Sequence, residues 1–526
     1  MRNRLFHDWV NPKLDAWLLI IMSICIGFTS GLSTAISSYV ISGLAANPAD
    51  AAMCSYVYAG GMAVSFTFSG SLRSYYSSKQ LIIVSALLLM FLNFALTQTD
   101  SPTIVILCTF FIGGIRLLGI IVVVVNLIPI LMPQGERYKL YCVYYPISLM
   151  VTPLSGIFQV NLAERLGWHF SFHVSNLTLF IVLILIIIFA KNIHYGRRIP
   201  LWKFDWFGLC LMCGWIVAFS YVLAYGRNQD WLSSGDIQIA VVLCAGLLLL
   251  YILRNELIRN KILQFDLFLK RNVRVGLIIM FFFCIFYNLS SPLSTWMNIS
   301  FRNDPIENAS ANIYPIYGYI LGAGISFLYY MYYNTFKPMI LFTTFCYIIS
   351  TTSFYLLVDT QTTASQMFYP LVLRGVAIIC SYITIGMYAY SGLTTTEISI
   401  ASAILIFVRS YLGPAIWGCV FSNWLYYRPI QLLDKLASSS DATDPLFQLR
   451  FQGLHTPNAD PLVAYKVFYT QASLESIKEL FGWSCVIGVG MFIFLVFFPI
   501  YKKPDRKLFN WGKTENEEDL ASAVTS

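Results

Sequence analysis

Runs of about 20 apolar residues recur along the whole chain, and they constrain its fold more than any other feature. A helix of about 20 residues crosses the hydrocarbon core of a bilayer, and it satisfies its own backbone N–H and C=O groups there. The chain is 57% hydrophobic and 11% charged, whereas ordinary soluble domains are about 25% charged. Such a chain lacks the polar residues that would cover a soluble surface. We therefore expect an all-α polytopic membrane protein.

The apolar runs predict fourteen membrane spans. They lie near residues 17–41, 51–70, 80–98, 103–126, 140–161, 171–190, 205–225, 236–253, 274–297, 312–332, 338–358, 367–391, 398–425 and 482–501. Most of the loops between them are short. The polar stretch 427–480 is the exception, and we expect it to form a long extracytoplasmic loop.

The lysines and arginines set the expected orientation of these spans. With the N-terminus in the cytoplasm, the inner segments carry 23 of the 34 lysines and arginines, and the short outer loops carry 3. An excess of positive charge on cytoplasmic segments is the usual topology signal. We therefore expect an inner-membrane protein with both termini in the cytoplasm. The net charge of +8 needs no nucleic-acid partner to explain it.

Several short segments occur in a recognisable order. They are GSLRSYYSSK at 70–79, GGIRLLG at 113–119, TPLSG at 152–156, FDWFGLCL at 204–211 and the long helical stretch 373–418. Together they resemble the major facilitator superfamily, in particular its fourteen-span drug:proton antiporter branch. The resemblance assigns structural motif roles to Gly70, Leu72, Gly119, Pro153, Gly156, Asp205, Trp206 and Arg374.

The resemblance implies a fold of two six-helix bundles with two helices between them. The expected boundaries are a cytoplasmic N-terminus at 1–16, an N-terminal bundle at 17–190, linker helices at 205–253, a basic cytoplasmic linker at 254–273, a C-terminal bundle at 274–501 and a cytoplasmic tail at 502–526. A substrate would occupy a cavity between the bundles and would be released by alternating access.

The chain also departs from the motifs of this branch. The acidic position of the loop between the second and third spans is Ser74, and the region of the first span from Ser30 to Thr34 lacks the aspartate that the branch places there. Thr152 and Ile157 replace two glycines of the fifth-span motif. These departures argue against proton coupling by the usual route of the family.

Three arginines lie well inside predicted spans: Arg116, Arg374 and Arg409. An arginine at the centre of a bilayer costs about 2.5–3.5 kcal/mol even on insertion scales, so it defaults to a functional hypothesis. The alternative is an arginine whose donors are satisfied by backbone carbonyls and hydroxyls. The sequence leaves both readings open for Arg116, favours a functional one for Arg409 and a structural one for Arg374.

Other polar residues are candidates for the wall of a transport cavity. Ser30 and Thr34 occupy the region of the missing aspartate, and Tyr287 and Asn288 interrupt the apolar ninth span. His173 is one of few titratable groups near a span and is a candidate proton carrier. The complete set expected to contact substrate or coupling ion is Arg116, Arg409, Ser30, Thr34, Tyr287, Asn288 and His173.

These features predict a secondary transporter that exports amphiphilic small molecules or drugs with proton coupling. Because three positive charges face no carboxylate, an exporter of an anionic lipid or metabolite without the usual coupling route is a second reading. A membrane sensor or scaffold that does not transport is a third. The expected partners are a small-molecule substrate, protons, the lipid bilayer and, from the resemblance, a membrane-fusion adaptor protein. We expect no enzymatic activity, cofactor, metal or nucleic acid.

Overall fold

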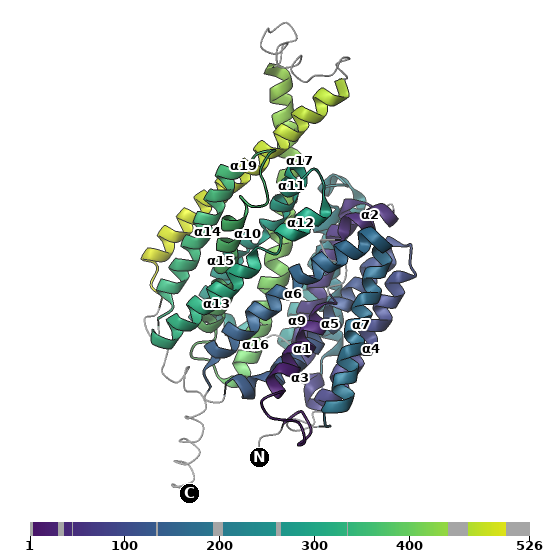
Figure 1. Ribbon diagram of the computed structural model, residues 1–526, viewed down its shortest axis with the longest axis vertical. Helices are drawn as coiled ribbons and strands as arrows, with labels where there is room; N and C mark the ends of the chain where they lie inside the picture. The colour runs from purple at the N-terminus through teal and green to yellow at the C-terminus, as the bar shows by residue number, and fades with distance from the viewer. Residues whose placement is uncertain are drawn as a thin grey trace.

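The computed structural model describes residues 4–29, 36–44, 46–132, 135–192, 204–258, 265–333, 335–439 and 461–500. In this part of the chain the regular structure is helical, and an isolated β-bridge between Phe6 and Ala190 is the single extended pairing. The helices pack side by side in one elongated body (Figure 1). The predicted fold class, an all-α polytopic protein, is confirmed.

The helices before residue 190 form the N-terminal half. They are α1 (Asp15–Gly27), α2 (Ser37–Leu44), α3 (Pro48–Tyr75), α4 (Ser78–Thr97), α5 (Pro102–Leu131), α6 (Arg137–Leu166) and α7 (Trp168–Phe189). Two further long helices, α8 (Trp206–Tyr225) and α9 (Gly235–Leu257), follow with the short turn η2 (Trp231–Ser233) between them.

The helices after residue 264 form the C-terminal half. They are η3 (Phe265–Leu269), α10 (Arg271–Asn288), α11 (Ser290–Ser300), α12 (Pro305–Ala311), α13 (Pro315–Tyr332), α14 (Lys337–Leu357), α15 (Phe368–Ala389), α16 (Thr395–Ile406), the π-helical turn η4 (Phe407–Leu412), α17 (Gly413–Ser439) and α19 (Pro461–Phe497).

Each half has its own buried apolar core. In the N-terminal half the core includes Leu19, Ile82 and Leu179, which come from α1, α4 and α7. In the C-terminal half it includes Phe283 and Ile379, from α10 and α15. The helices α8 and α9 pack on each other, and α8 packs on α3, outside both cores. Each core lies mainly within one half, with Tyr138 and Cys142 of α6 joining the C-terminal core and Ala309 of α12 joining the N-terminal one.

Twelve helical segments among the described residues are long and apolar enough to cross a membrane. A helix occupies the region of every predicted span, but two of them fall short of this standard. α1 ends after 13 residues, and the 18 residues of α13 include five tyrosines, which lower its hydropathy. The count of fourteen spans therefore stays a prediction.

The two ends of the body differ. One end, which we call the basic end, carries the N-terminal segment and the starts of α4 and α14; there Lys79 and Lys337 bond to the last carbonyls of α7 and α19. The opposite end, which we call the hairpin end, carries the projecting ends of α17 and α19 (Figure 1). Residues 427–439 and 461–480, expected to be loop, are helical extensions of these two helices.

The two halves meet along two seams. In one seam, α6 of the N-terminal half packs against α12, α13 and α15. In the other, α3 packs against η4 and α16. Side chains that face these seams are the ones positioned to contact a molecule held between the halves.

Candidate functional site

Arg116 lies on α5 beside a close contact between α3 and α5. A Cβ added at Gly113 would lie 2.1 Å from the carbonyl oxygen of Tyr58, so only glycine allows this approach. The close contact places the Arg116 guanidinium against two protein acceptors. Its Nη2 donates to the carbonyl of Gly27 at 2.6 Å, and its Nη1 donates to the hydroxyl of Tyr58. Arg116 is thus held by a helix end and a tyrosine, in place of an aspartate.

The first-span candidates Ser30 and Thr34 lie outside the described residues. The described part of the first span ends with Thr29, shortly after the last residue of α1. The contact of Arg116 with the first span is therefore the carbonyl of Gly27.

Arg374 lies on α15 and is buried, with 7% of its surface exposed. Its Nη2 donates to the carbonyl of Tyr287 at 2.7 Å. Tyr287 and Asn288 are the last two residues of α10, and the Asn288 amide donates to the carbonyl of Cys284 within the same helix. The structure therefore brings together three residues that the sequence analysis had treated separately.

Arg409 lies in η4, where the helix widens into a π-helical turn. π-helical turns inside α-helices are rare and often occur at functional sites. The Arg409 guanidinium carbon lies 4.2 Å from the centroid of the Tyr382 ring and 5.4 Å from that of Tyr145. Guanidinium groups are attracted to aromatic faces within about 6 Å, more strongly where water is excluded.

Further tyrosines extend this contact into a cluster. The rings of Tyr145 and Tyr382 lie 6.1 Å apart, those of Tyr141 and Tyr145 5.2 Å apart, and those of Tyr287 and Tyr382 6.2 Å apart. We call Arg409, Tyr141, Tyr145, Tyr287 and Tyr382 the arginine–tyrosine cluster. Tyr141 and Tyr145 come from α6 and the others from the C-terminal half, so the cluster lies on the seam between the halves.

The sequence analysis missed the tyrosines of α6 and α15 in this cluster. The segment YCVYY at 141–145 carried a signal, because residues 141 and 145 are four apart and share one face of a helix. The signal is weak in a chain with 33 tyrosines. The approach of α6 to α15 singles out Tyr145 and Tyr382, and that approach is a long-range contact.

Several carboxylates of the described helices form ion pairs with arginines. Asp15 pairs with Arg4, Asp205 with Arg254 and Glu479 with Arg428. In the part of the chain that the structure describes, no ion pair links a carboxylate to Arg116, Arg374 or Arg409. The region of the three arginines is therefore electropositive.

His173 lies away from the arginines. It is exposed on α7, on the same face as Phe170, Leu177 and Phe180, each of which is also exposed. These residues repeat every three or four positions, as on one outward apolar face of a helix. The structure therefore does not bring His173 together with the arginine–tyrosine cluster.

The residues of the resembling motifs have packing roles of different kinds. Gly119 is buried, and a Cβ there would lie 3.0 Å from the hydroxyl of Ser85 on α4. Gly156 is buried and Pro153 half-buried within α6. Leu72 packs at the edge of the N-terminal core, whereas Gly70 is exposed and a Cβ there would meet nothing.

Asp205 and Trp206 begin the first of the two intervening helices. The Asp205 carboxylate accepts a hydrogen bond from the backbone N–H of Gly208 at 2.9 Å and so caps the start of α8. It also accepts two N–H groups of Arg254 at the end of α9, at 2.8 and 3.0 Å. Trp206 is largely exposed. The motif thus joins α8 to α9 through one bidentate ion pair.

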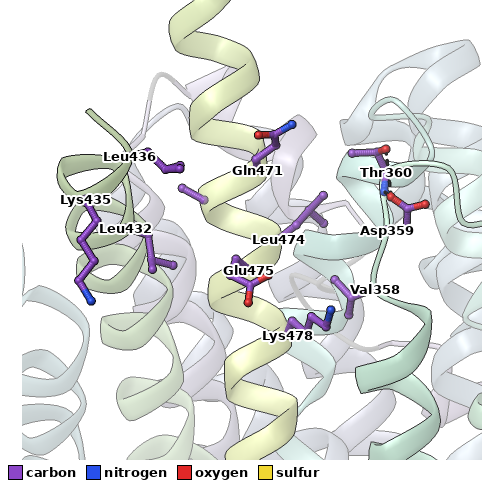
Figure 2. A pocket seen from close by; sticks show the side chains of 11 residues that line it. Val358, Asp359, Thr360, Leu432, Lys435, Leu436, Gln471, Leu474, Glu475 and Lys478 are labelled. Atoms are coloured by element: carbon purple, nitrogen blue, oxygen red, sulfur yellow. Dashed lines mark hydrogen bonds between the residues drawn. The ribbon is translucent and has the colours of Figure 1, made fainter. Parts of the chain in front are cut away.

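A cavity of about 530 Å³ opens at the hairpin end, between α17, α19 and the segment after α14 (Figure 2). Its charged residues are Asp359, Lys435, Glu475 and Lys478, two of each sign. The cavity has the size of a ligand pocket. None of the site residues expected from the sequence lines this cavity. Its two positive and two negative residues cancel, whereas Arg116, Arg374 and Arg409 pair with no carboxylate among the described residues.

Residues 17–418 match the family described as Major Facilitator Superfamily. A colistin resistance protein EmrB of Acinetobacter baumannii is 21% identical over 392 residues, which cover 72% of this chain and 74% of that protein. A multidrug export protein EmrB of Haemophilus influenzae is 20% identical over 458 residues, covering 83% of this chain and 85% of that protein.

Solved structures share the arrangement of the helices. The peptide transporter POT in complex with sulfate superposes with a TM-score of 0.58 at 13% identity, over 93% of this chain and 96% of the other. The nucleoside transporter NupG superposes with a TM-score of 0.53 at 12% identity, over 93% and 100%. At such low identity these likenesses concern the fold alone.

Proposed function

The chain belongs to the Major Facilitator Superfamily, and from that premise we propose that it exports amphiphilic small molecules by alternating access, with the substrate held at the arginine–tyrosine cluster. Membership of the family makes it an integral membrane transporter. The two relatives are named for colistin resistance and multidrug export. The proposal extends export of such molecules to this chain.

One observation carries the proposal: the guanidinium of Arg409 lies on the seam beside aromatic rings from both halves. Arg409 and Tyr382 come from the C-terminal half, and Tyr145 comes from the N-terminal half. Aromatic faces suit the apolar part of an amphiphile, and a guanidinium suits an anionic or polar head. Because both halves contribute, a relative movement of the halves would change the contacts of a bound molecule.

The test is flux through proteoliposomes that contain the purified protein. The probes are 8-anilino-1-naphthalenesulfonate, an anionic aromatic amphiphile, and ethidium, a cationic one, each measured with and without a pH gradient. We expect flux of the anionic probe and its loss in Arg409→Gln, with Arg302→Gln as the control because Arg302 lies in an exposed turn. Flux of neither probe would contradict the proposal.

Proton coupling is the finer part of this proposal and rests on the resemblance to the antiporter branch. The same proteoliposomes test it, because a pH gradient would then accelerate flux of the probe. The electropositive region favours a second function, export of an anionic lipid or metabolite without the usual coupling route. Flux of the anionic probe that ignores the pH gradient would support this second function.

The orientation and an adaptor partner complete the proposal. The predicted inner segments carry 23 of the 34 lysines and arginines, and this excess favours cytoplasmic termini in an inner membrane. The hairpin of α17 and α19 would then project outward, where a membrane-fusion adaptor could bind it. An ion pair of Arg428 and Glu479, with N–O distances of 2.6 and 2.8 Å, ties the two helices together. Deletion of residues 436–460 with full transport and full adaptor association would contradict this role.

A further inference from the structure

In each half, the helix that begins the first long segment ends before that segment does. In the N-terminal half, α1 ends at Gly27 and α2 begins at Ser37. In the C-terminal half, α10 ends at Asn288 and α11 begins at Ser290. An interrupted helix leaves its last carbonyls without backbone partners inside the helix. At the C-terminal break the carbonyl of Tyr287 accepts the hydroxyl of Ser290 at 3.3 Å. In a membrane such carbonyls need another donor.

In each half, an arginine donates to the carbonyl where the first helix ends. The two arginines lie on helices that have the same rank in their halves. Counting the interrupted segment as the first, α5 and α15 are the fourth long helices of their halves. Arg116 of α5 donates to the carbonyl of Gly27 at 2.6 Å, and Arg374 of α15 donates to the carbonyl of Tyr287 at 2.7 Å. In both contacts the donor is Nη2.

The two halves also share the helix packing that brings Arg116 and Arg374 to these helix ends. α3 and α5 approach through Gly61 and Gly113, where an added Cβ would lie 2.1 Å from a backbone carbonyl oxygen of the other helix. α13 and α15 approach through Gly318 and Gly375, where the corresponding distances are 2.1 and 2.4 Å. The second and fourth helices of both halves therefore touch backbone to backbone beside an arginine.

A helix C-terminus is the negative end of the helix dipole, so a guanidinium there supplies both donors and compensating charge. We propose that Arg116 and Arg374 are equivalent positioning residues that hold the interrupted first helix of their halves, and that Arg374 thereby fixes the Tyr287 wall of the substrate site. The carbonyl that Arg374 holds belongs to Tyr287 itself, whose ring lies 6.2 Å from that of Tyr382. The second part of this inference rests on the proposed function; the first part does not.

Hydrogen–deuterium exchange of the purified protein in lipid nanodiscs tests the first part. In Arg374→Gln we expect the amides of residues 285–291 to exchange about tenfold faster, since a buried hydrogen bond to a charged group is lost. Arg374→Lys, which keeps the charge and one donor group, should restore part of the protection and keeps the test usable if the glutamine variant fails to fold. Arg73→Gln is the matched control, because Arg73 donates to Ser69 within its own helix, α3.

Binding of 8-anilino-1-naphthalenesulfonate to the same nanodiscs tests the second part. We expect its Kd to rise about three- to tenfold in Arg374→Gln and to remain unchanged in Arg73→Gln. Unchanged exchange at residues 285–291 in a folded Arg374→Gln protein would overturn the positioning role. Faster exchange with an unchanged Kd would overturn the link to the substrate site. A wild-type protein that binds no probe would contradict the proposed function, while the exchange result would still decide the positioning role.

Discussion

The N-terminal and C-terminal halves share a scaffold but differ in what they offer a substrate. In both, an arginine of the fourth helix bonds to a carbonyl where the first helix ends. Arg116 also bonds to the hydroxyl of Tyr58 and is only half-buried, whereas Arg374 is buried beneath the cluster. The bond from arginine to carbonyl therefore has a structural role in both halves. The residues around each arginine decide how closely it is linked to the arginine–tyrosine cluster.

A second shared contact lies at the basic end. Lys79, at the start of α4, donates to the carbonyls of Ile187 and Ala190 at the end of α7, at 3.1 and 2.7 Å. Lys337, at the start of α14, donates to the carbonyls of Val496 and Phe498 at the end of α19, at 2.7 and 3.1 Å. In each half the third long helix thus holds the end of the last one.

The halves differ most at the seam. The C-terminal half supplies the cation Arg409, and α6 of the N-terminal half supplies tyrosines. A symmetric scaffold therefore carries an asymmetric site. The two shared arginines keep helices in place, whereas Arg409, which has no counterpart among them, contacts tyrosines of both halves. The following predictions test this division of roles, beginning with the largest effect.

The largest effect is expected at the close helix contacts. Gly113→Ala and Gly375→Ala each place a Cβ within 2.4 Å of a backbone carbonyl oxygen, so the helices must separate. Overpacking of this kind costs about 1–3 kcal/mol and occasionally more. We expect a several-fold loss of folded protein on size-exclusion chromatography for both variants. Gly324→Ala is the control, because a Cβ there meets nothing within 4 Å. Normal yield of Gly113→Ala or Gly375→Ala would contradict the claim that both halves depend on this close contact.

The next effect separates the two scaffold arginines. Arg374→Gln should lower the free energy of unfolding by about 1–3 kcal/mol, since a buried carbonyl loses a charged donor. Arg116→Gln should lower it less, because Arg116 is half-buried and the Tyr58 hydroxyl can bond elsewhere. Thermal unfolding in detergent measures both. If Arg116→Gln proves less stable than Arg374→Gln, the predicted order of the two stability losses is wrong.

A smaller effect is expected on probe binding at the cluster. Tyr382→Leu removes the ring that lies against Arg409, and cation–π contacts contribute about 0.5–2 kcal/mol. We expect a loss of affinity for 8-anilino-1-naphthalenesulfonate of about three- to tenfold. Tyr382→Phe keeps the ring and should retain most of the affinity. Equal losses in the two variants would show that the hydroxyl, and not the aromatic face, matters.

The smallest effect is expected at the basic end. Lys79→Met and Lys337→Met each remove a cation from a helix C-terminus, worth about 0.3–1 kcal/mol when partly exposed. The two variants should lose similar amounts of thermal stability, because the distances in the two halves match. A loss confined to one variant would mean that the contact supports one half only.

The helical class and the approximate place of every span follow from the sequence, because apolar runs of 20 residues have one solution in a membrane. The arginines Arg116, Arg374 and Arg409 were recognisable as well, since charge inside such a run is rare. Their partners were not. The acceptors at Gly27 and Tyr287 are backbone carbonyls, and a carbonyl carries no sequence signal.

Three other features were missed by the sequence analysis. The interruption at Leu289 comes three residues before Pro292, which lacks the N–H that would bond to the carbonyl of Asn288, and the analysis did not use this signal. The expected loop after residue 427 contains helix-forming residues such as Leu432 and Lys435, which extend α17 once α19 packs beside it. The pairing of Tyr145 with Tyr382 depends on how two halves dock, and docking is a long-range property.

The central claim is that the halves part at the seam during transport, and a reversible cross-link tests it most directly. Tyr138 of α6 and Phe327 of α13 face each other across the seam, with ring centroids 5.6 Å apart. Tyr314 and Phe368 lie within the C-terminal half, with centroids 5.2 Å apart. Each pair is replaced by cysteines and joined with a short bifunctional methanethiosulfonate, beside wild-type protein treated in the same way.

Flux of 8-anilino-1-naphthalenesulfonate in proteoliposomes is the measurement. We predict that the Tyr138→Cys/Phe327→Cys link abolishes flux and that reduction restores it. The Tyr314→Cys/Phe368→Cys link should leave flux unchanged. Full flux through protein linked at 138 and 327 would contradict the claim that the halves move apart there.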